Sequence, residues 1–229
     1  MKKLTVSLRR SEIIAGFIFM VMQILVLPFL LVLCNELLPH PMSEVELNFA
    51  SFALNFIGVT VIFHRFLIDS AKAFLRSPGN NLLICLGGFG LYWFSSIAVN
   101  GLVLFLEPEF SNVNDDSIQL LTQQSMVLMT VSTVLLVPVT EECLYRGLLF
   151  GLLYRKNAIL GYVVSVAVFS ALHVISYIGM YDPFRLFLCF LQYLPASISL
   201  AWTYTQADSI WAPVLIHTLV NLIGMLAIQ

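Results

Sequence analysis

The chain has 229 residues, of which 59% are hydrophobic and only 10% are charged, whereas a soluble domain carries about 25% charged residues. Its 11 Lys and Arg against 13 Asp and Glu leave no basic excess to hold a nucleic acid. The mean hydropathy of +0.93, spread over the whole chain, excludes a soluble globular protein, a disordered segment and a soluble domain on a single anchor. The composition predicts an all-α, polytopic membrane protein.

Apolar runs long enough to cross a bilayer recur along the chain, since a hydrocarbon core of about 30 Å needs roughly 20 apolar residues per helix. They lie near residues 12–37, 47–68, 82–106, 119–154, 158–178, 184–204 and 209–227. The fourth run is too long for one straight crossing, and Pro138, which has no amide hydrogen, is the expected place for a kink or a split. We expect a transmembrane helical bundle of seven spans, or eight if this run divides.

Positive charges flank alternate spans. The connections between these cationic segments are acidic and contain Arg185 as their only cation. Because Lys and Arg near span ends stay on the cytoplasmic side, we expect an integral membrane protein with a cytoplasmic N-terminus, in the cell membrane if it is bacterial, and an external C-terminus for seven spans. The cations that carry this expectation are Lys2, Lys3, Arg9, Arg10, Arg65, Lys72, Arg76, Arg155 and Lys156.

Ionisable side chains are concentrated in the last four runs. Each costs about 2.5 to 3.5 kcal/mol on insertion into a membrane, so each is a candidate for function. The first three runs hold mostly Gly, Ser and amides in their interiors. The candidates in the later runs are Glu141, Glu142, Arg146, His173 and His217, together with the neutral Asn221.

Helix geometry separates the two adjacent glutamates. Glu142 and Arg146 are four residues apart and share one helix face, where they can form an ion pair, whereas Glu141 points about 100° away. Glu141 is therefore the spare carboxylate. A carboxylate in a low-dielectric site that no cation neutralises can accept a proton from water, as a general base does. The Glu142–Arg146 pair is most simply interpreted as an internal ion pair that holds helices together and positions Glu141 indirectly.

The histidines approach from other helices. His217 and Asn221 are four residues apart, so one helix turn directs both side chains to the same place, where they could stabilise an oxyanion. His173 supplies a third direction, although an intramembrane histidine can also serve only as a hydrogen bond between helices. The nearby aromatic residues are interpreted as core or interfacial side chains, namely Tyr145, Phe169 and Trp211.

Three short motifs follow one another in the later runs. They are Glu-Glu-x-x-x-Arg at residues 141–146, Phe-x-x-x-His at 169–173 and His-x-x-x-Asn at 217–221. In this order they resemble the motifs of the CPBP family, the CAAX proteases and bacteriocin-processing enzymes also called Abi proteins. The resemblance covers about residues 119–227. We expect motif-free membrane helices over residues 1–118 and a CPBP-like catalytic core over residues 119–229.

The resemblance implies an intramembrane endopeptidase whose antiparallel helices enclose a polar cavity. By this similarity Glu141 and His173 would activate the attacking water, His217 and Asn221 would stabilise the tetrahedral intermediate, and Glu142 would support the site with Arg146. The implied partners are the lipid bilayer and a peptide or protein substrate, with or without a lipid group. Prenylated CAAX peptides and bacteriocin or signalling peptides are both implied as substrates. No nucleic acid is expected.

A zinc ion is the alternative to metal-free catalysis. Glu141, His173 and His217 could form a three-ligand site with one open position for water. The chain has no His-Glu-x-x-His motif, in which one helix turn fixes two ligands, and Asn221 beside His217 suits an oxyanion donor better than a ligand for zinc. We therefore expect no cofactor.

Two other classes of function remain open. One is a non-catalytic membrane scaffold for immunity or cell-envelope regulation, and the other is a proton-coupled transporter, which also uses buried Glu and His. The absence of an inverted repeat in the sequence speaks against the transporter.

Counting residues along the helices places Glu141 and His217 nearer the cytoplasmic ends, so we expect the cavity to open on that side.

Overall fold

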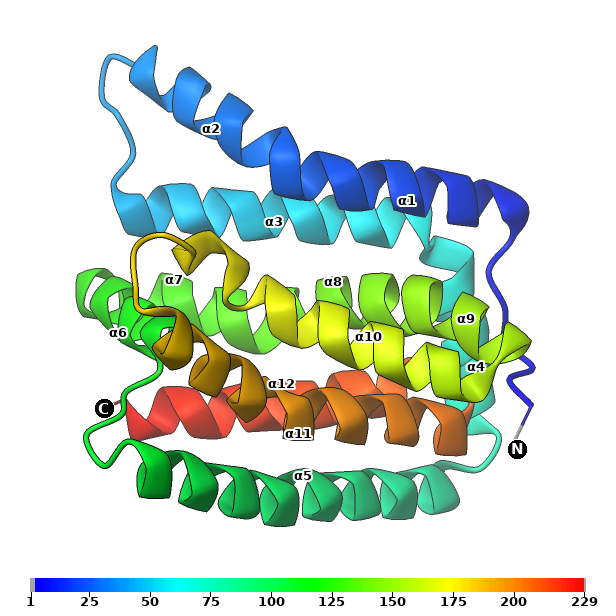
Figure 1. The fold of residues 1–229 in the computed structure, drawn as a ribbon. Helices are drawn as coiled ribbons and strands as arrows, with labels where there is room; N and C mark the ends of the chain where they lie inside the picture. The colour runs from blue at the N-terminus through cyan, green and yellow to red at the C-terminus, as the bar shows by residue number, and fades with distance from the viewer. Residues whose placement is uncertain (1–2, 229) are drawn as a thin grey trace.

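The chain folds into a bundle of helices that run alongside one another (Figure 1). The computed structural model describes residues 3–228, so Lys2 lies outside the described residues. The first rod is α1 (Arg10–Leu25) followed by α2 (Leu27–Glu36), with a bend of 47° between them. The next helices in chain order are α3 (Glu44–Ile62), α4 (His64–Leu75), α5 (Pro78–Leu106) and α6 (Val113–Gln124).

The later half of the chain supplies the centre of the bundle. Its first rod, Met126–Lys156, is one continuous helix in which π-helical and α-helical segments alternate. These segments are α7 (Met126–Thr130), the π-helical Val131–Leu136, α8 (Val137–Glu141), the π-helical Glu142–Phe150 and α9 (Gly151–Lys156). The remaining helices are α10 (Ala158–Leu172), the short 3₁₀ turn Ile175–Tyr177, α11 (Pro183–Ala207) and α12 (Trp211–Ala227).

The all-α class and the transmembrane character of the helices are confirmed. Within residues 3–228, 4 helices are long and apolar enough to cross a membrane, or up to 5 with the bent α1–α2 pair. Helices α10 and α12 are apolar but have 15 and 17 residues, fewer than the roughly 20 that span a bilayer. The exact number of seven crossings stays a prediction.

The alternative of a split at Pro138 is wrong. The long fourth run breaks instead at Ser125, whose backbone is extended (φ −156°, ψ 102°) and whose hydroxyl accepts a hydrogen bond from the Leu128 amide at 3.4 Å. This cap starts the central helix afresh at Met126. Pro138 lies between the two π-helical segments, and the helix passes through it without a break.

The central helix and α11 are the most buried rods. In their most apolar windows, 56% and 50% of the residues are buried, against 11% in α3 and in α5. The outer faces of the peripheral helices expose large apolar side chains such as Phe94 and Phe105, as expected for contact with lipid. The costly polar residues of the later runs thus lie where other helices surround them.

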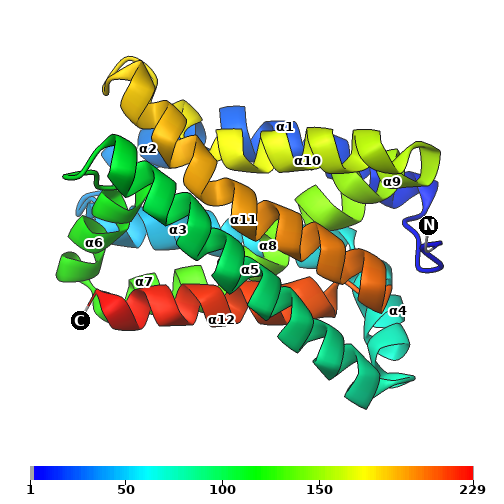
Figure 2. The same ribbon diagram turned by 60° about the horizontal axis from the view of Figure 1, so that its bottom comes forward.

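A close contact at Gly88 joins the periphery to the centre. Figure 2 shows α5 and α11 running side by side. Between them, Ser199 donates a hydrogen bond to the Gly88 carbonyl at 2.6 Å, and a Cβ at Gly88 would overlap the Thr203 hydroxyl. Small residues let membrane helices approach closely, and hydroxyl groups then bond across the interface. This contact fixes α11, which contributes to the site described below.

The two ends of the bundle differ in charge. The N-terminal segment, α4 and the α9–α10 turn lie at one end, and the α2–α3 connection, the α5–α6 connection, α6 and the C-terminus lie at the other (Figure 1). We call these the cationic end and the acidic end. At the cationic end Arg155 donates to the Leu4 and Val6 carbonyls at 2.9 and 2.7 Å, and Asp208 accepts from the Thr5 amide at 2.9 Å. Which end faces the cytoplasm stays a prediction.

Candidate active site

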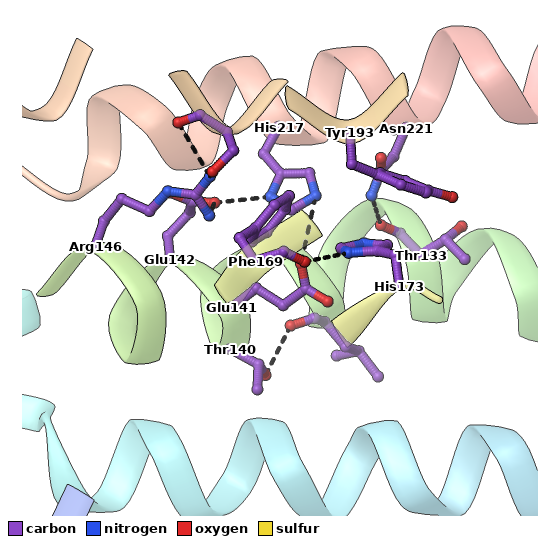
Figure 3. Close-up of polar contacts among 12 residues, drawn as sticks. Thr133, Thr140, Glu141, Glu142, Arg146, Phe169, His173, Tyr193, His217 and Asn221 are labelled. Atoms are coloured by element: carbon purple, nitrogen blue, oxygen red, sulfur yellow. Dashed lines mark hydrogen bonds and ion pairs between the residues drawn. The ribbon is translucent and has the colours of Figure 1, made fainter. Parts of the chain in front are cut away.

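One cavity of about 590 Å³ lies among the central helices. Its lining includes Glu141, His173, His217 and Asn221, and Figure 3 shows their side chains grouped between the central helix, α10 and α12. The structure therefore brings together the four residues that the sequence motifs single out. Glu142 and its partner arginine lie behind this lining and are fully buried.

The predicted ion pair between Glu142 and Arg146 is present. Nη1 of Arg146 donates to Oε1 of Glu142 at 3.0 Å, and both side chains are 0% exposed. The guanidinium also donates to the Ser197 hydroxyl at 3.3 Å and lies 4.0 Å from the centre of the Phe169 ring. Further polar contacts of this kind make a buried ion pair tolerable, and here they satisfy it in part, since Nε of Arg146 and Oε2 of Glu142 have no hydrogen-bond partner among the described residues. The pair therefore anchors the central helix to both α10 and α11.

His217 reaches both glutamates, which the sequence did not predict. Its Nδ1 lies 2.9 Å from Oε1 of Glu142 and its Nε2 lies 3.9 Å from Oε2 of Glu141. Because Oε1 of an ionised Glu142 can only accept, Nδ1 is the protonated nitrogen, and in the neutral ring Nε2 is an acceptor. Nε2 and the Glu141 carboxylate are then two acceptors on either side of a gap that one donor such as water can fill.

His173 is fixed at the end of α10. Its Nδ1 lies 2.8 Å from the Phe169 carbonyl, to which it donates, so Nε2 of the neutral ring is the proton acceptor. The ring lies between two aromatic rings, with centroids 4.7 Å from Phe169 and 4.1 Å from Tyr193, and it stacks on Tyr193 at an interplanar angle of 25°. This packing restricts the imidazole to one orientation.

Asn221 is held by a carbonyl that the helix leaves unpaired. The Val137 amide bonds to the Ser132 carbonyl in the π-helical pattern, and Pro138, next in line, has no amide hydrogen. The Thr133 carbonyl therefore lacks its helical donor and accepts Nδ2 of Asn221 at 2.7 Å. One amide hydrogen of Asn221 is thus engaged and the second remains for another acceptor.

The convergence of His217 and Asn221 differs from the prediction. Both side chains line the cavity, but the hydrogen bond of His217 leads to Glu142 and that of Asn221 leads to Thr133. These two acceptors lie nine residues apart on the central helix. The spacing of His217 and Asn221 along α12 puts them on one helix face. Their hydrogen-bond acceptors on the central helix decide where each side chain points.

Several residues of the site were not predicted from the sequence. Phe169 was interpreted as a core aromatic, and it is 2% exposed, but its ring also contacts Arg146, His173 and His217. Its place four residues before His173 was the signal, because this spacing puts both on one helix face. No sequence pattern pointed to the other contributors, Thr133, Tyr193 and Ser197.

The zinc alternative does not fit the donors as they are arranged. Across residues 3–228, no group of three His, Cys, Asp or Glu side chains is placed to hold a metal ion. Glu141, His173 and His217 share the cavity lining without forming such a group. The mechanism proposed below therefore contains no step through a metal.

The expectation that the cavity opens toward the cationic end is wrong. Its lining continues through the start of α6, at Asn112–Ser117, and the last turn of α12, both at the acidic end (Figures 1 and 2). Toward the cationic end a cluster of rings packs around Phe150, with centroids 5.1 to 6.2 Å away. Those rings belong to Tyr154, Tyr162 and Tyr204. Counting residues along a helix gives the depth of a side chain. It does not show at which end of the bundle large aromatic rings close the cavity.

Comparison with known proteins identifies the region that carries the motifs. Residues 123–223 match the family model described as "Type II CAAX prenyl endopeptidase Rce1-like". The "Putative membrane peptidase YdiL" of Bacillus subtilis (strain 168) is 25% identical over 175 residues, which cover 73% of this chain and 67% of that protein. No solved structure matches the chain. Residues 123–223 are thus similar to the Rce1-like proteases, and the resemblance to the CPBP family predicted from the three motifs is confirmed over this region.

Proposed function

We propose that the protein is an intramembrane endopeptidase in which Glu141 activates a water molecule for attack on a peptide bond. The observation that carries this proposal is the contrast between two adjacent carboxylates. Glu142 is neutralised by Arg146 at 3.0 Å, whereas Oε2 of Glu141 is buried beside the cavity and accepts no hydrogen bond from the described residues. An unneutralised carboxylate in such a place is suited to take a proton.

The other groups have complementary roles in this mechanism. Water loses a proton to Glu141 as its oxygen attacks the peptide carbonyl carbon, and the C=O pair of electrons moves onto the carbonyl oxygen. The free amide hydrogen of Asn221 donates to that oxyanion, and Nε2 of His217 joins it by sharing the proton that Glu141 has taken from water across the 3.9 Å gap between the two side chains. When the C–N bond breaks, Glu141 returns its proton to the leaving nitrogen, and His173, oriented by the Phe169 carbonyl at 2.8 Å, assists the transfers through Nε2.

We further propose that residues 119–229 form the catalytic core of a cell-membrane protein whose N-terminus is cytoplasmic. Residues 1–118 contain no motif, but they contribute part of the cavity lining through α3, α5 and the start of α6. The substrate is a peptide or protein segment, of the CAAX type or of the bacteriocin and signalling type.

The test compares wild type with Glu141→Gln in membranes and as purified protein. We expect processed peptides to appear only with wild type, and the variant to lose at least about 10²-fold in rate while its melting temperature is unchanged. Glu107→Gln, an exposed acid in the α5–α6 connection, is the matched control and should cleave normally. Cleavage by Glu141→Gln at the wild-type rate would overturn the mechanism. A cellular phenotype that survives Glu141→Gln would instead favour the non-catalytic scaffold.

A further inference from the structure

The part of the cavity toward the acidic end is lined by amide side chains that bond to one another. Asn112 donates to Oε1 of Gln192 at 2.7 Å, and Gln192 donates to Oδ1 of Asn100 at 3.1 Å. Asn114 donates to the Tyr193 hydroxyl at 2.9 Å. We call the four amide residues Asn100, Asn112, Asn114 and Gln192, together with the neighbouring acid Asp115, the amide rim. The rim joins α5, α6 and α11, and it presents groups that can bond to a peptide backbone.

The lining of the cavity has acids but no permanent cation. Glu141 and Asp115 both contribute to it, and the lining residues within 3–228 include neither Lys nor Arg. Arg185 is at the same end of the bundle, but it lies 3.4 Å from Asp116 and donates to the Ser111 carbonyl at 3.1 Å, outside the lining. The Glu141 side chain is 22% exposed, whereas Asp115 is exposed. Two acids lining one cavity repel an entering anion and attract a cation.

Asp115 lies close to the reacting groups along the cavity. The Tyr193 hydroxyl lies 3.5 Å from Oδ1 of Asp115, and the ring of the same tyrosine stacks on His173 at 4.1 Å. One tyrosine side chain therefore separates the rim acid from the imidazole. An extended peptide advances about 3.3 Å per residue, so about two or three residues would cover the 3.5 and 4.1 Å contacts by which this tyrosine joins Asp115 to His173.

We propose that the cavity accepts an internal segment of a peptide and that Asp115 selects a Lys or Arg side chain two or three residues from the cleaved bond. This inference rests on the proposed endopeptidase function and names its substrate class. A CAAX peptide ends within a few residues of its prenylated cysteine, so its terminal carboxylate would come to lie near Asp115 with no lining cation to pair it. Substrates that place a free carboxylate near Asp115 are therefore expected to bind and be cleaved poorly.

The test uses one peptide sequence with Lys, Gln or Glu at the selected position, and a truncated form ending three residues after the bond as a free acid or as an amide. For wild type we expect kcat/KM to fall from Lys to Gln to Glu, with Lys over Glu by about tenfold or more, and the amide to exceed the acid. Asp115→Asn should bring the Lys-to-Glu ratio close to one while the Gln peptide is still cleaved. Glu109→Gln, an exposed acid outside the lining, should keep the wild-type ratio.

Binding to the Glu141→Gln protein separates this inference from the proposed function. Fluorescence anisotropy of the labelled Lys and Glu peptides reports the preference without any cleavage, and Asp115→Asn in the same background should remove it. Equal binding of both peptides, or a preference that survives Asp115→Asn, would overturn the inference even if the protein cleaves peptides. A free-acid peptide cleaved faster than its amide, with the advantage lost in Arg185→Gln, would overturn it in favour of carboxylate binding by that arginine.

Discussion

Removing one charge of the buried Glu142–Arg146 pair should destabilise the protein far more than removing both. Both side chains are 0% exposed and their charged atoms are 3.0 Å apart. Arg146→Met leaves the Glu142 carboxylate buried with His217, 2.9 Å away, as its remaining donor. Breaking a buried pair in this way costs about 3 to 5 kcal/mol. At about 2 to 4 °C per kcal/mol for a chain of this length, the melting temperature should fall by about 6 to 20 °C.

The double variant Glu142→Gln/Arg146→Met gives the contrast. It removes both charges, and the Gln side-chain oxygen still accepts from His217, so the loss should be below about 1.5 kcal/mol. Thermal unfolding of the purified proteins in one detergent compares wild type with both variants, and Arg76→Met, which removes an exposed cation, serves as the control. An Arg146→Met protein that melts within about 2 °C of wild type, or a double variant less stable than Arg146→Met, would refute the reasoning.

Four further predictions follow from separate features. Pro138→Ala restores a backbone donor near the carbonyl that holds Asn221, so cleavage should slow by about tenfold with little change in melting temperature; an unchanged rate would contradict this. Gly88→Ala should cost about 1 to 3 kcal/mol through overlap with Thr203, and a second change, Thr203→Ala, should restore most of the stability in the same unfolding assay. Tyr193→Leu removes the ring stacked on the His173 imidazole and should lower kcat, whereas Tyr193→Phe keeps the ring and should retain kcat; equal kcat in both would argue against positioning by stacking. Exhaustive chelation should leave the cleavage rate of the purified protein unchanged, and activity restored only by added zinc would contradict metal-free catalysis.

Local spacing and the cost of charge in a membrane account for what could be predicted from the sequence. The Glu142–Arg146 pair follows from a separation of four residues, which places two side chains on one helix face. The gathering of Glu141 with the histidines follows from the expense of ionisable groups in lipid, which drives them toward the interior of a bundle. Both arguments need only the residue types and their positions.

Contacts between distant segments account for what could not be predicted. The break at Ser125 rather than at Pro138 depends on how α6 leaves the central helix, and the π-helical pattern is completed by Asn221 from α12. The stacking of Tyr193 on His173 requires α11 to be fixed against α5. Periodicity within one segment contains no information about any of these contacts.

The two helices that carry the imidazoles are shorter than a bilayer is thick. At 1.5 Å per residue, α10 and α12, with 15 and 17 residues, are about 23 and 26 Å long, whereas the hydrocarbon layer measures about 30 Å. Lipid beside a short apolar helix thins to relieve this hydrophobic mismatch. If α10 and α12 cross the membrane, the headgroups and their water come closer to the helix ends, and so to His173 at the end of α10. We therefore expect the acyl-chain length of the host membrane to change the rate of the proposed hydrolysis.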